Sequence, residues 1–131
     1  MAFDRVVELA AHFLGVPSSV ISLLSQDKQW FLARKGIEAQ ETARDIAFCE
    51  HTIATQDGSL VVQDALKDVR FHNNPLVTGP IGLRFYAGAA LQVADVHRLG
   101  ALCVIDTKPR EFAQQEEAVL KHLAQIVVDE F

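Results

Sequence analysis

The stretch that decides the fold runs from Asp68 to Asp106 and reads DVRFHNNPLVTGPIGLRFYAGAALQVADVHRLGALCVID. A polar loop with two prolines leads into an apolar strand, a short turn and a second apolar strand. Every residue of the second strand, from Leu99 to Ile105, is apolar. Antiparallel strands with one wet face usually alternate apolar and polar residues. Both faces of this hairpin are therefore expected to be dry, and the long loop beside it is a candidate cover for one of them.

The composition is typical of a single globular domain. The chain has 131 residues, of which 50% are hydrophobic and 22% are charged, which suffices for one core. Its formal net charge is −5. The sequence contains no cluster of Lys and Arg of the kind that binds nucleic acid. No apolar run approaches the roughly 18 residues of a membrane span, and the N-terminus lacks the basic start of a signal peptide. We expect a cytoplasmic protein that binds neither nucleic acid nor membrane.

Hydrophobic periodicity divides the chain into helices and strands. Apolar residues recur at helical spacing in three segments, which predicts helices at 3–14, 46–55 and about 113–131. Short apolar or alternating runs predict strands at 19–24, 29–35, 60–62, 85–93 and 98–105. The polar segment 37–45 is expected to be a loop, and Asp45 is the candidate N-cap of the second helix.

Two segments stand out in this division. Residues 64–84 contain two prolines, two glycines and two adjacent asparagines, and compact domains seldom carry so long an irregular loop unless it binds or covers something. The last helix ends on Val128–Phe131 with its apolar pattern still running. We therefore expect residues 1–131 to be one domain of a longer protein.

Several short motifs, spread in order along the chain, resemble those of one family. They are QWF at 29–31, FCEHTI at 48–53, DVRF at 68–71, NPLV at 74–77, RFYAG at 84–88 and HRLGALCVID at 97–106. Together they resemble the GAF domain, a sensory module of bacterial signalling proteins, and most closely the subgroup found upstream of diguanylate cyclases and histidine kinases. The chain departs from that subgroup at Ala47, where a capping Ser or Thr is usual, and at Ala90 and Val96.

The resemblance implies an α+β fold with a central antiparallel sheet of five or six strands. The N- and C-terminal helices would pack on one face, and a short helix and the loop 64–84 would cover the other. A small molecule, which the sequence does not identify, would bind between sheet and loop. The candidate pocket residues are Phe48, Cys49, His51, Asp64, Phe71, Asn74, Arg84 and Tyr86. The terminal helices would form a homodimer and relay binding to an output domain that follows Phe131.

The residues themselves give little support to catalysis or metal binding. Cys49 and His51 lie two apart on a predicted helix, so they do not face one another as a nucleophile and its base would. The five histidines show no metal-ligand spacing. Cys49 and Cys103 lie in apolar surroundings, which favour buried and inert thiols over a redox pair. We predict no catalytic residue and no metal site.

Some alternatives stay open at this stage. Arg84 either offers a bidentate fork to an anionic ligand or pairs with Asp64 or Asp68 and so fastens the loop to the sheet. Phe71 and Tyr86 either stack on a flat ligand or belong to the core. Two other functions compete with the sensor: a dimerisation module with a vestigial pocket, and a cysteine-based reductase of free methionine sulfoxide, the reaction of one branch of the GAF family.

Overall fold

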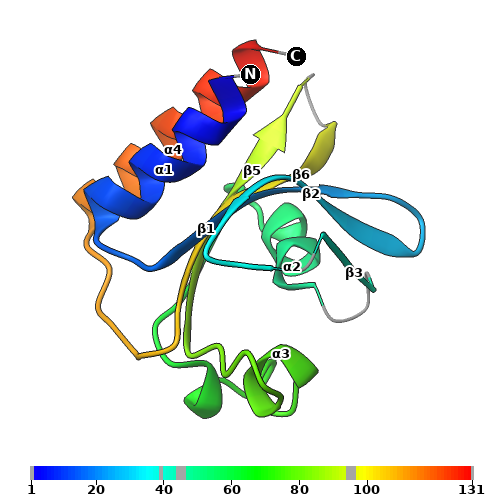
Figure 1. Ribbon diagram of the computed structural model, residues 1–131, viewed down its shortest axis with the longest axis vertical. Helices are drawn as coiled ribbons and strands as arrows, with labels where there is room; N and C mark the ends of the chain where they lie inside the picture. Colours follow the sequence, from blue (N-terminus) through cyan, green and yellow to red (C-terminus); the bar gives the residue numbers. More distant parts are fainter. Residues whose placement is uncertain (1, 39, 44–46, 94–96, 131) are drawn as a thin grey trace.

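The computed structural model describes residues 2–38, 40–43, 47–93 and 97–130, which form a six-stranded antiparallel sheet covered on both faces (Figure 1). The strands are β1 (Ser18–Leu24), β2 (Lys28–Lys35), β3 (Glu41–Ala43), β4 (Ser59–Val62), β5 (Phe85–Gln92) and β6 (Arg98–Asp106). The helices are α1 (Ala2–Leu14), α2 (Phe48–Ala54), α3 (Pro75–Thr78), α4 (Gln114–Asp129) and the 3₁₀ turn η2 (Ala65–Lys67). The strand order is β3-β2-β1-β6-β5-β4. The predicted α+β class is confirmed.

The terminal helices α1 and α4 lie side by side on one face of the sheet (Figure 1). Val7 and Ala10 of α1 and Leu120 and Val127 of α4 are buried there in one cluster with Leu102 of β6. Each large apolar side chain removed from water in this way stabilises the fold by about 1.5–3 kcal/mol. The amphipathic patterns of the two predicted helices therefore assign their inner faces correctly.

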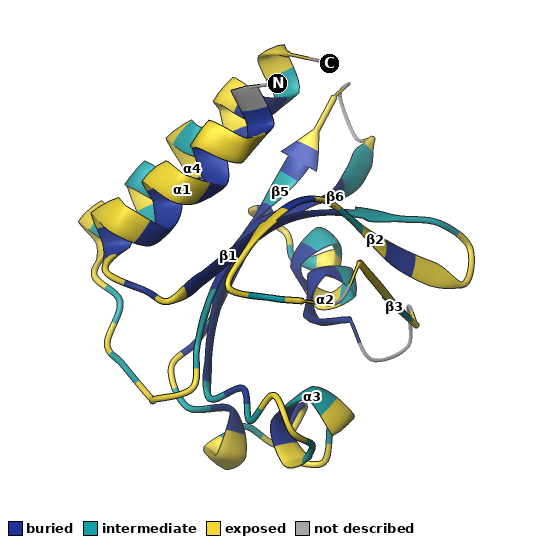
Figure 2. Cartoon of the chain, in the orientation of Figure 1, coloured by how far each residue is buried: buried dark blue, intermediate teal, exposed yellow. Residues whose placement is uncertain are grey.

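The central hairpin is dry on both faces, as its sequence predicts. Successive residues of β6 point to opposite sides of the sheet, so Leu102 and Val104 join the cluster under the terminal helices. Ala101 and Cys103 join a second cluster on the opposite face. All four are buried, and Figure 2 shows the buried interior of the sheet between its two covers.

Strands β1 and β6 approach so closely at Gly100 that no side chain fits there. Gly100 pairs with Leu23 of β1 and with Leu91 of β5. A Cβ atom at this position would overlap the backbone carbonyl oxygen of Ser22. Glycine therefore allows the central strands to pair at this point.

The loop predicted for residues 37–45 was wrong for Glu41–Ala43, which form the edge strand β3. These residues pair with Lys28–Trp30 of β2. Their contacts are polar: Lys28 Nζ lies 3.2 Å from Glu41 Oε2, and Gln29 Nε2 donates to Thr42 Oγ1 at 2.8 Å. A short polar strand suits an exposed sheet edge. Its sequence does not alternate between apolar and polar residues, so the usual signal of a strand is absent.

The segment 64–84, called the flap below, is more regular than predicted. It contains η2 and α3, and each begins at a side-chain cap. Asp64 Oδ1 accepts from the Leu66 backbone N–H at 3.2 Å, and Asn74 Oδ1 accepts from that of Leu76 at 2.8 Å. Pro75 stands in the first turn of α3, where its missing N–H costs nothing.

Helix α2 begins at Phe48, two residues later than predicted. Its N-cap residue is Ala47, which provides no side-chain hydrogen bond to the helix. The predicted cap, Asp45, lies outside the described residues. Position 47 therefore does not supply the capping side chain that an N-cap residue often provides.

Candidate functional site

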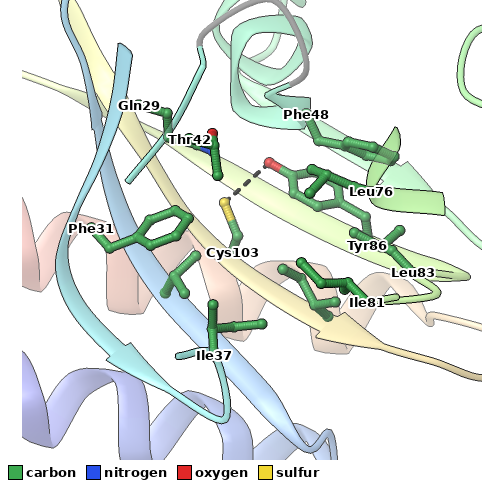
Figure 3. A pocket seen from close by; sticks show the side chains of 12 residues that line it. Gln29, Phe31, Ile37, Thr42, Phe48, Leu76, Ile81, Leu83, Tyr86 and Cys103 are labelled. Carbon is green, nitrogen blue, oxygen red and sulfur yellow. Dashed lines mark hydrogen bonds between the residues drawn. The ribbon is translucent and has the colours of Figure 1, made fainter. Parts of the chain in front are cut away.

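A small apolar cavity lies between the sheet and the elements that cover its second face. Its volume is about 40 Å³. The strands contribute the lining residues Val20, Gln29, Phe31, Thr42, Tyr86, Cys103 and Ile105. The cover contributes Ile37, Phe48, Leu76, Ile81 and Leu83. Figure 3 shows Phe31 and Ile37 across the cavity from Phe48 and Tyr86.

The polar side chains of this cavity form two hydrogen-bonded chains. In the first, Cys49 Sγ donates to Gln29 Oε1 at 2.7 Å, and Gln29 Nε2 donates to Thr42 Oγ1 at 2.8 Å. In the second, the Tyr86 hydroxyl lies 2.8 Å from Thr52 Oγ1 and 3.1 Å from Cys103 Sγ (Figure 3). Buried polar groups are tolerated when they are bonded in this way.

Burial keeps the second chain neutral. Desolvation raises the pKa of the Cys103 thiol well above its ordinary value of 9.0, and the neighbouring Cys49 adds to the shift. Desolvation likewise raises the pKa of the Tyr86 hydroxyl well above its ordinary value of 10.0. A thiol held in its protonated form is a poor nucleophile, so Cys103 is suited to packing and hydrogen bonding.

Cys49 and His51 point to different environments, as two residues two apart on a helix must. Cys49 is 1% exposed and bonds to β2. His51 is exposed, and its ring meets Phe71 of the flap edge-on, with 4.7 Å between centroids. Phe71 in turn stacks on Phe48 at 4.1 Å. These aromatic contacts join α2 to the flap.

The three polar candidates of the flap shape the flap itself. Asp64 and Asn74 provide the caps described above. Arg84 Nη1 donates to the backbone carbonyl oxygens of Val77 at 2.9 Å and Leu83 at 3.0 Å. The alternative in which Arg84 forms an ion pair with Asp64 or Asp68 was therefore wrong about the partner, although Arg84 does fasten the flap.

Asp68 has a different cationic partner. Arg70 Nη2 lies 2.8 Å from Asp68 Oδ2, and this side-chain hydrogen bond holds the pKa of the Asp68 carboxyl below its ordinary value. The first and third residues of the motif DVRF thus pair with each other locally. Arg84 binds backbone oxygens of the flap instead of the Asp68 carboxylate.

Of the eight predicted pocket residues, Phe48 and Tyr86 line the cavity directly. Cys49 and Phe71 stand behind it, while His51, Asp64, Asn74 and Arg84 lie in the cover. Sequence reasoning missed most of the lining, including the polar residues Gln29 and Thr42. The alternation of Gln29, Trp30 and Phe31 was a usable signal, because a strand that carries Phe31 to the covered face carries Gln29 there too.

The cavity lining carries no charge. None of the described residues that line it is Lys, Arg, His, Asp or Glu. In the described part of the chain, no group of three or more His, Cys, Asp or Glu side chains could hold a metal ion.

None of the described helices is long and apolar enough to cross a membrane.

Helix α2 is held at its C-terminal end by Arg98, the first residue of β6. Arg98 Nη1 donates to the carbonyl oxygens of Ile53, at 2.9 Å, and Thr55. Arg98 Nη2 donates to that of Gln56 at 3.2 Å. The last carbonyls of a helix lack intrahelical partners, and a cation there also interacts favourably with the helix dipole. The guanidinium therefore fixes this end of α2 to the sheet.

The connector that follows α2, residues 55–58, and Ser59 at the start of β4 also contact the C-terminal helix. Ser59 Oγ donates to Glu117 Oε2 at 2.8 Å. Lys121 Nζ lies 4.0 Å from Asp57 Oδ2, in an exposed pair that contributes little. A continuous set of contacts thus runs from Phe48 at the cavity, through α2 and the connector, to α4.

Comparison with known sequences gives two results. The family model described as GAF domain matches residues 1–129. The protein described as cyclic di-GMP phosphodiesterase PA2567, from Pseudomonas aeruginosa, is 39% identical over 127 residues. The match covers 96% of this chain but only 22% of that protein.

Comparison with solved structures shows the same fold. The GAF domain from an Acinetobacter phosphoenolpyruvate-protein phosphotransferase has a TM-score of 0.78 at 19% identity, over 98% of this chain and 81% of that one. The free methionine-R-sulfoxide reductase from Neisseria meningitidis has a TM-score of 0.76 at 15% identity, over 98% and 75%. At these identities the likeness concerns the fold alone.

The buried thiol and phenol make the stability of the domain sensitive to alkaline pH. In the unfolded chain, Cys103 and Tyr86 ionise near 9.0 and 10.0, whereas the folded state keeps both protonated. Their contribution is therefore complete below pH 9.0 and is lost as the pH rises above it. Each group ionised only in the unfolded state lowers the free energy of unfolding by about 1.4 kcal/mol per pH unit.

Urea denaturation under reducing conditions, at pH values on both sides of the ordinary thiol pKa, measures this decline. Cys103→Ala lacks the thiol and should show a shallower decline over the same range. Equal slopes for the wild type and the variant would contradict the raised pKa of Cys103.

Proposed function

The chain belongs to the GAF domain family, and we propose that it is a non-catalytic regulatory module of a bacterial signalling protein. It binds a small molecule in the cavity between the sheet and the flap. The observation that supports this function is the connection of the cavity to the terminal helix. The same helix, α2, lines the cavity with Phe48 and is bonded at its other end to β6 and, through the connector, to α4.

The relay follows from this connection. A ligand changes an equilibrium between two arrangements only by its different affinity for them. A molecule that displaces Phe48 or the flap shifts α2, and Arg98 and Ser59 pass the shift to β6 and α4. Helix α4 then carries it to an output domain that follows Phe131 in the full protein.

The surroundings of the cysteines support a non-catalytic role. A cysteine nucleophile acts as a thiolate and needs access to its substrate. Cys103 is 1% exposed with a raised pKa, and Cys49 is 1% exposed and donates to Gln29. We therefore propose that this chain does not catalyse the reaction of the methionine sulfoxide reductases, although it shares their fold.

The context of the domain is proposed from its relative. The chain spans about a fifth of the length of the Pseudomonas protein named as a cyclic di-GMP phosphodiesterase. We place this chain accordingly within a longer cytoplasmic protein of cyclic di-GMP or two-component signalling. A position upstream of a cyclase or kinase domain agrees with the subgroup that the motifs resemble.

Homodimerisation through the terminal helices is the second part of the proposal. Leu9 and Phe13 of α1 are 48% and 70% exposed, and Ile126 of α4 is 48% exposed. Leu9 and Phe13 lie four residues apart and so share one face of their helix. A second copy of the chain would cover these side chains. If the cavity is vestigial, dimerisation becomes the main function.

Ligand binding in the cavity can be tested with the rim residue Leu76. In a thermal-shift screen of nucleotides, amino acids, organic acids and neutral apolar compounds, a compound at 100 times its Kd adds about 2.7 kcal/mol of stability. Leu76→Trp should fill the cavity from its rim and abolish the shift. Leu66→Trp, on an exposed leucine of the same flap, is the matched control and should keep it. Failure of every class of compound would favour the vestigial pocket.

The relay can be tested at Glu117, whose carboxylate accepts from Ser59. A compound found by the screen should slow amide hydrogen exchange in α4 of the wild type. In Glu117→Ala this protection should weaken about fivefold or more, a typical allosteric coupling, while affinity in the cavity stays the same. Glu130→Ala, at the other end of α4, should behave as the wild type. Unchanged protection in Glu117→Ala would contradict the proposed route.

The dimer can be tested by sedimentation velocity at several protein concentrations. The wild type should sediment as a dimer, and Phe13→Glu should sediment as a monomer because it places a charge in the proposed apolar interface. Val69→Glu alters an apolar residue of the flap that is 86% exposed, and it should remain dimeric. A wild type that is monomeric at all concentrations would refute the interface.

A further inference from the structure

We propose that the cavity selects an uncharged, mainly apolar molecule and rejects organic anions, nucleotides included. This inference rests on the proposed function, since it assumes that the cavity is the ligand site. It concerns the chemistry of the ligand, which neither the family nor the similar proteins specify for this chain.

The cavity offers an anion no counter-charge. The described lining residues include no basic side chain, and a charge buried without a partner is strongly disfavoured. Arg84, which follows the lining residue Leu83 in the flap, is not part of the lining and donates to the carbonyl oxygens of Val77 and Leu83. An anion in the cavity would therefore lose its hydration without gaining an ion pair.

The polar lining residues already have hydrogen-bond partners within the protein. Gln29 bonds to Thr42 and Cys49, and Tyr86 bonds to Cys103 and Thr52. A ligand rich in donors and acceptors would have to break these bonds and leave buried groups unpaired. An apolar body, in contrast, meets the remaining eight side chains, all of which are aliphatic or aromatic.

A hollow of about 450 Å³, called the vestibule, adjoins the cavity. Cavity and vestibule share three lining residues: Ile37 after β2, Ile81 in the flap and Ile105 in β6. Ile81 is 39% exposed. The cavity, of about 40 Å³, is far smaller than the several hundred Å³ of usual ligand pockets. A ligand larger than the cavity would therefore have to separate these isoleucines, which form an apolar gate.

The vestibule also disfavours anions. Its charged lining residues within the described chain are Glu38 and Asp106. Arg110 Nη1 lies 3.4 Å from Asp106 Oδ2 and offsets that carboxylate, which leaves Glu38 facing an incoming ligand. Electrostatic repulsion thus acts before desolvation does.

A matched pair of probes tests the proposal: benzyl alcohol and benzoate share one ring and differ in charge. The whole chain, labelled in its isoleucine methyl groups, is titrated with each compound to about 10 mM, which populates even millimolar complexes. Benzyl alcohol should shift the methyl signals of Ile37, Ile81 and Ile105 in a saturable manner. The signal of Ile126, which lines neither the cavity nor the vestibule and lies in the proposed dimer interface, is the internal control and should not move. Benzoate should bind at least about tenfold more weakly.

The remaining outcomes separate this inference from the proposed function. If benzoate shifts the gate isoleucines as strongly as benzyl alcohol, or more strongly, the ligand class is wrong and the cavity remains the site. If neither probe shifts them, the ligand class is also wrong, and the broader compound screen decides whether the cavity binds anything. Shifts of Ile126 equal to those of the gate would reveal non-specific binding and would overturn the proposal.

Discussion

The rest of the structure depends on the requirement that β5 and β6 be dry on both faces. Their side chains are apolar in both directions, so each face must be covered before the sheet is stable in water. The two ends of the chain return to cover one face with α1 and α4. The middle of the chain covers the other with α2 and the flap. The cavity lies under this second cover, which is built from several short elements.

The cavity combines an apolar surface with polar groups that are already bonded. Gln29, Thr42, Tyr86 and Cys103 direct their hydrogen bonds to protein partners. This arrangement stabilises the closed form without any ligand. A ligand would therefore gain affinity from apolar contacts. The cavity would be selective because it disfavours ligands that carry charges or many polar groups.

The sequence predicts the large elements of this fold well because long apolar patterns have one simple solution. The stripe in α4 and the unbroken run Leu99–Ile105 indicate a surface helix and a doubly covered strand, and both are found. β3 escaped prediction because Glu41–Ala43 carries no apolar pattern and is held by its partner strand. η2 and α3 are too short for periodicity, although the caps Asp64 and Asn74 were visible signals. The partner of Arg84 could not be predicted, because proximity in sequence does not show that Arg70 has already bound Asp68.

Helix α2 is held differently at its two ends. Its first turn is held through side chains, since Phe48 stacks on Phe71 and Cys49 donates to Gln29, whereas its last turn is held through backbone carbonyl oxygens by the guanidinium of Arg98. The side-chain packing of the first turn depends on what fills the cavity, but the backbone contacts of Arg98 do not. A molecule that displaces Phe48 would therefore tilt α2 about its C-terminal end, and a single arginine would set the pivot.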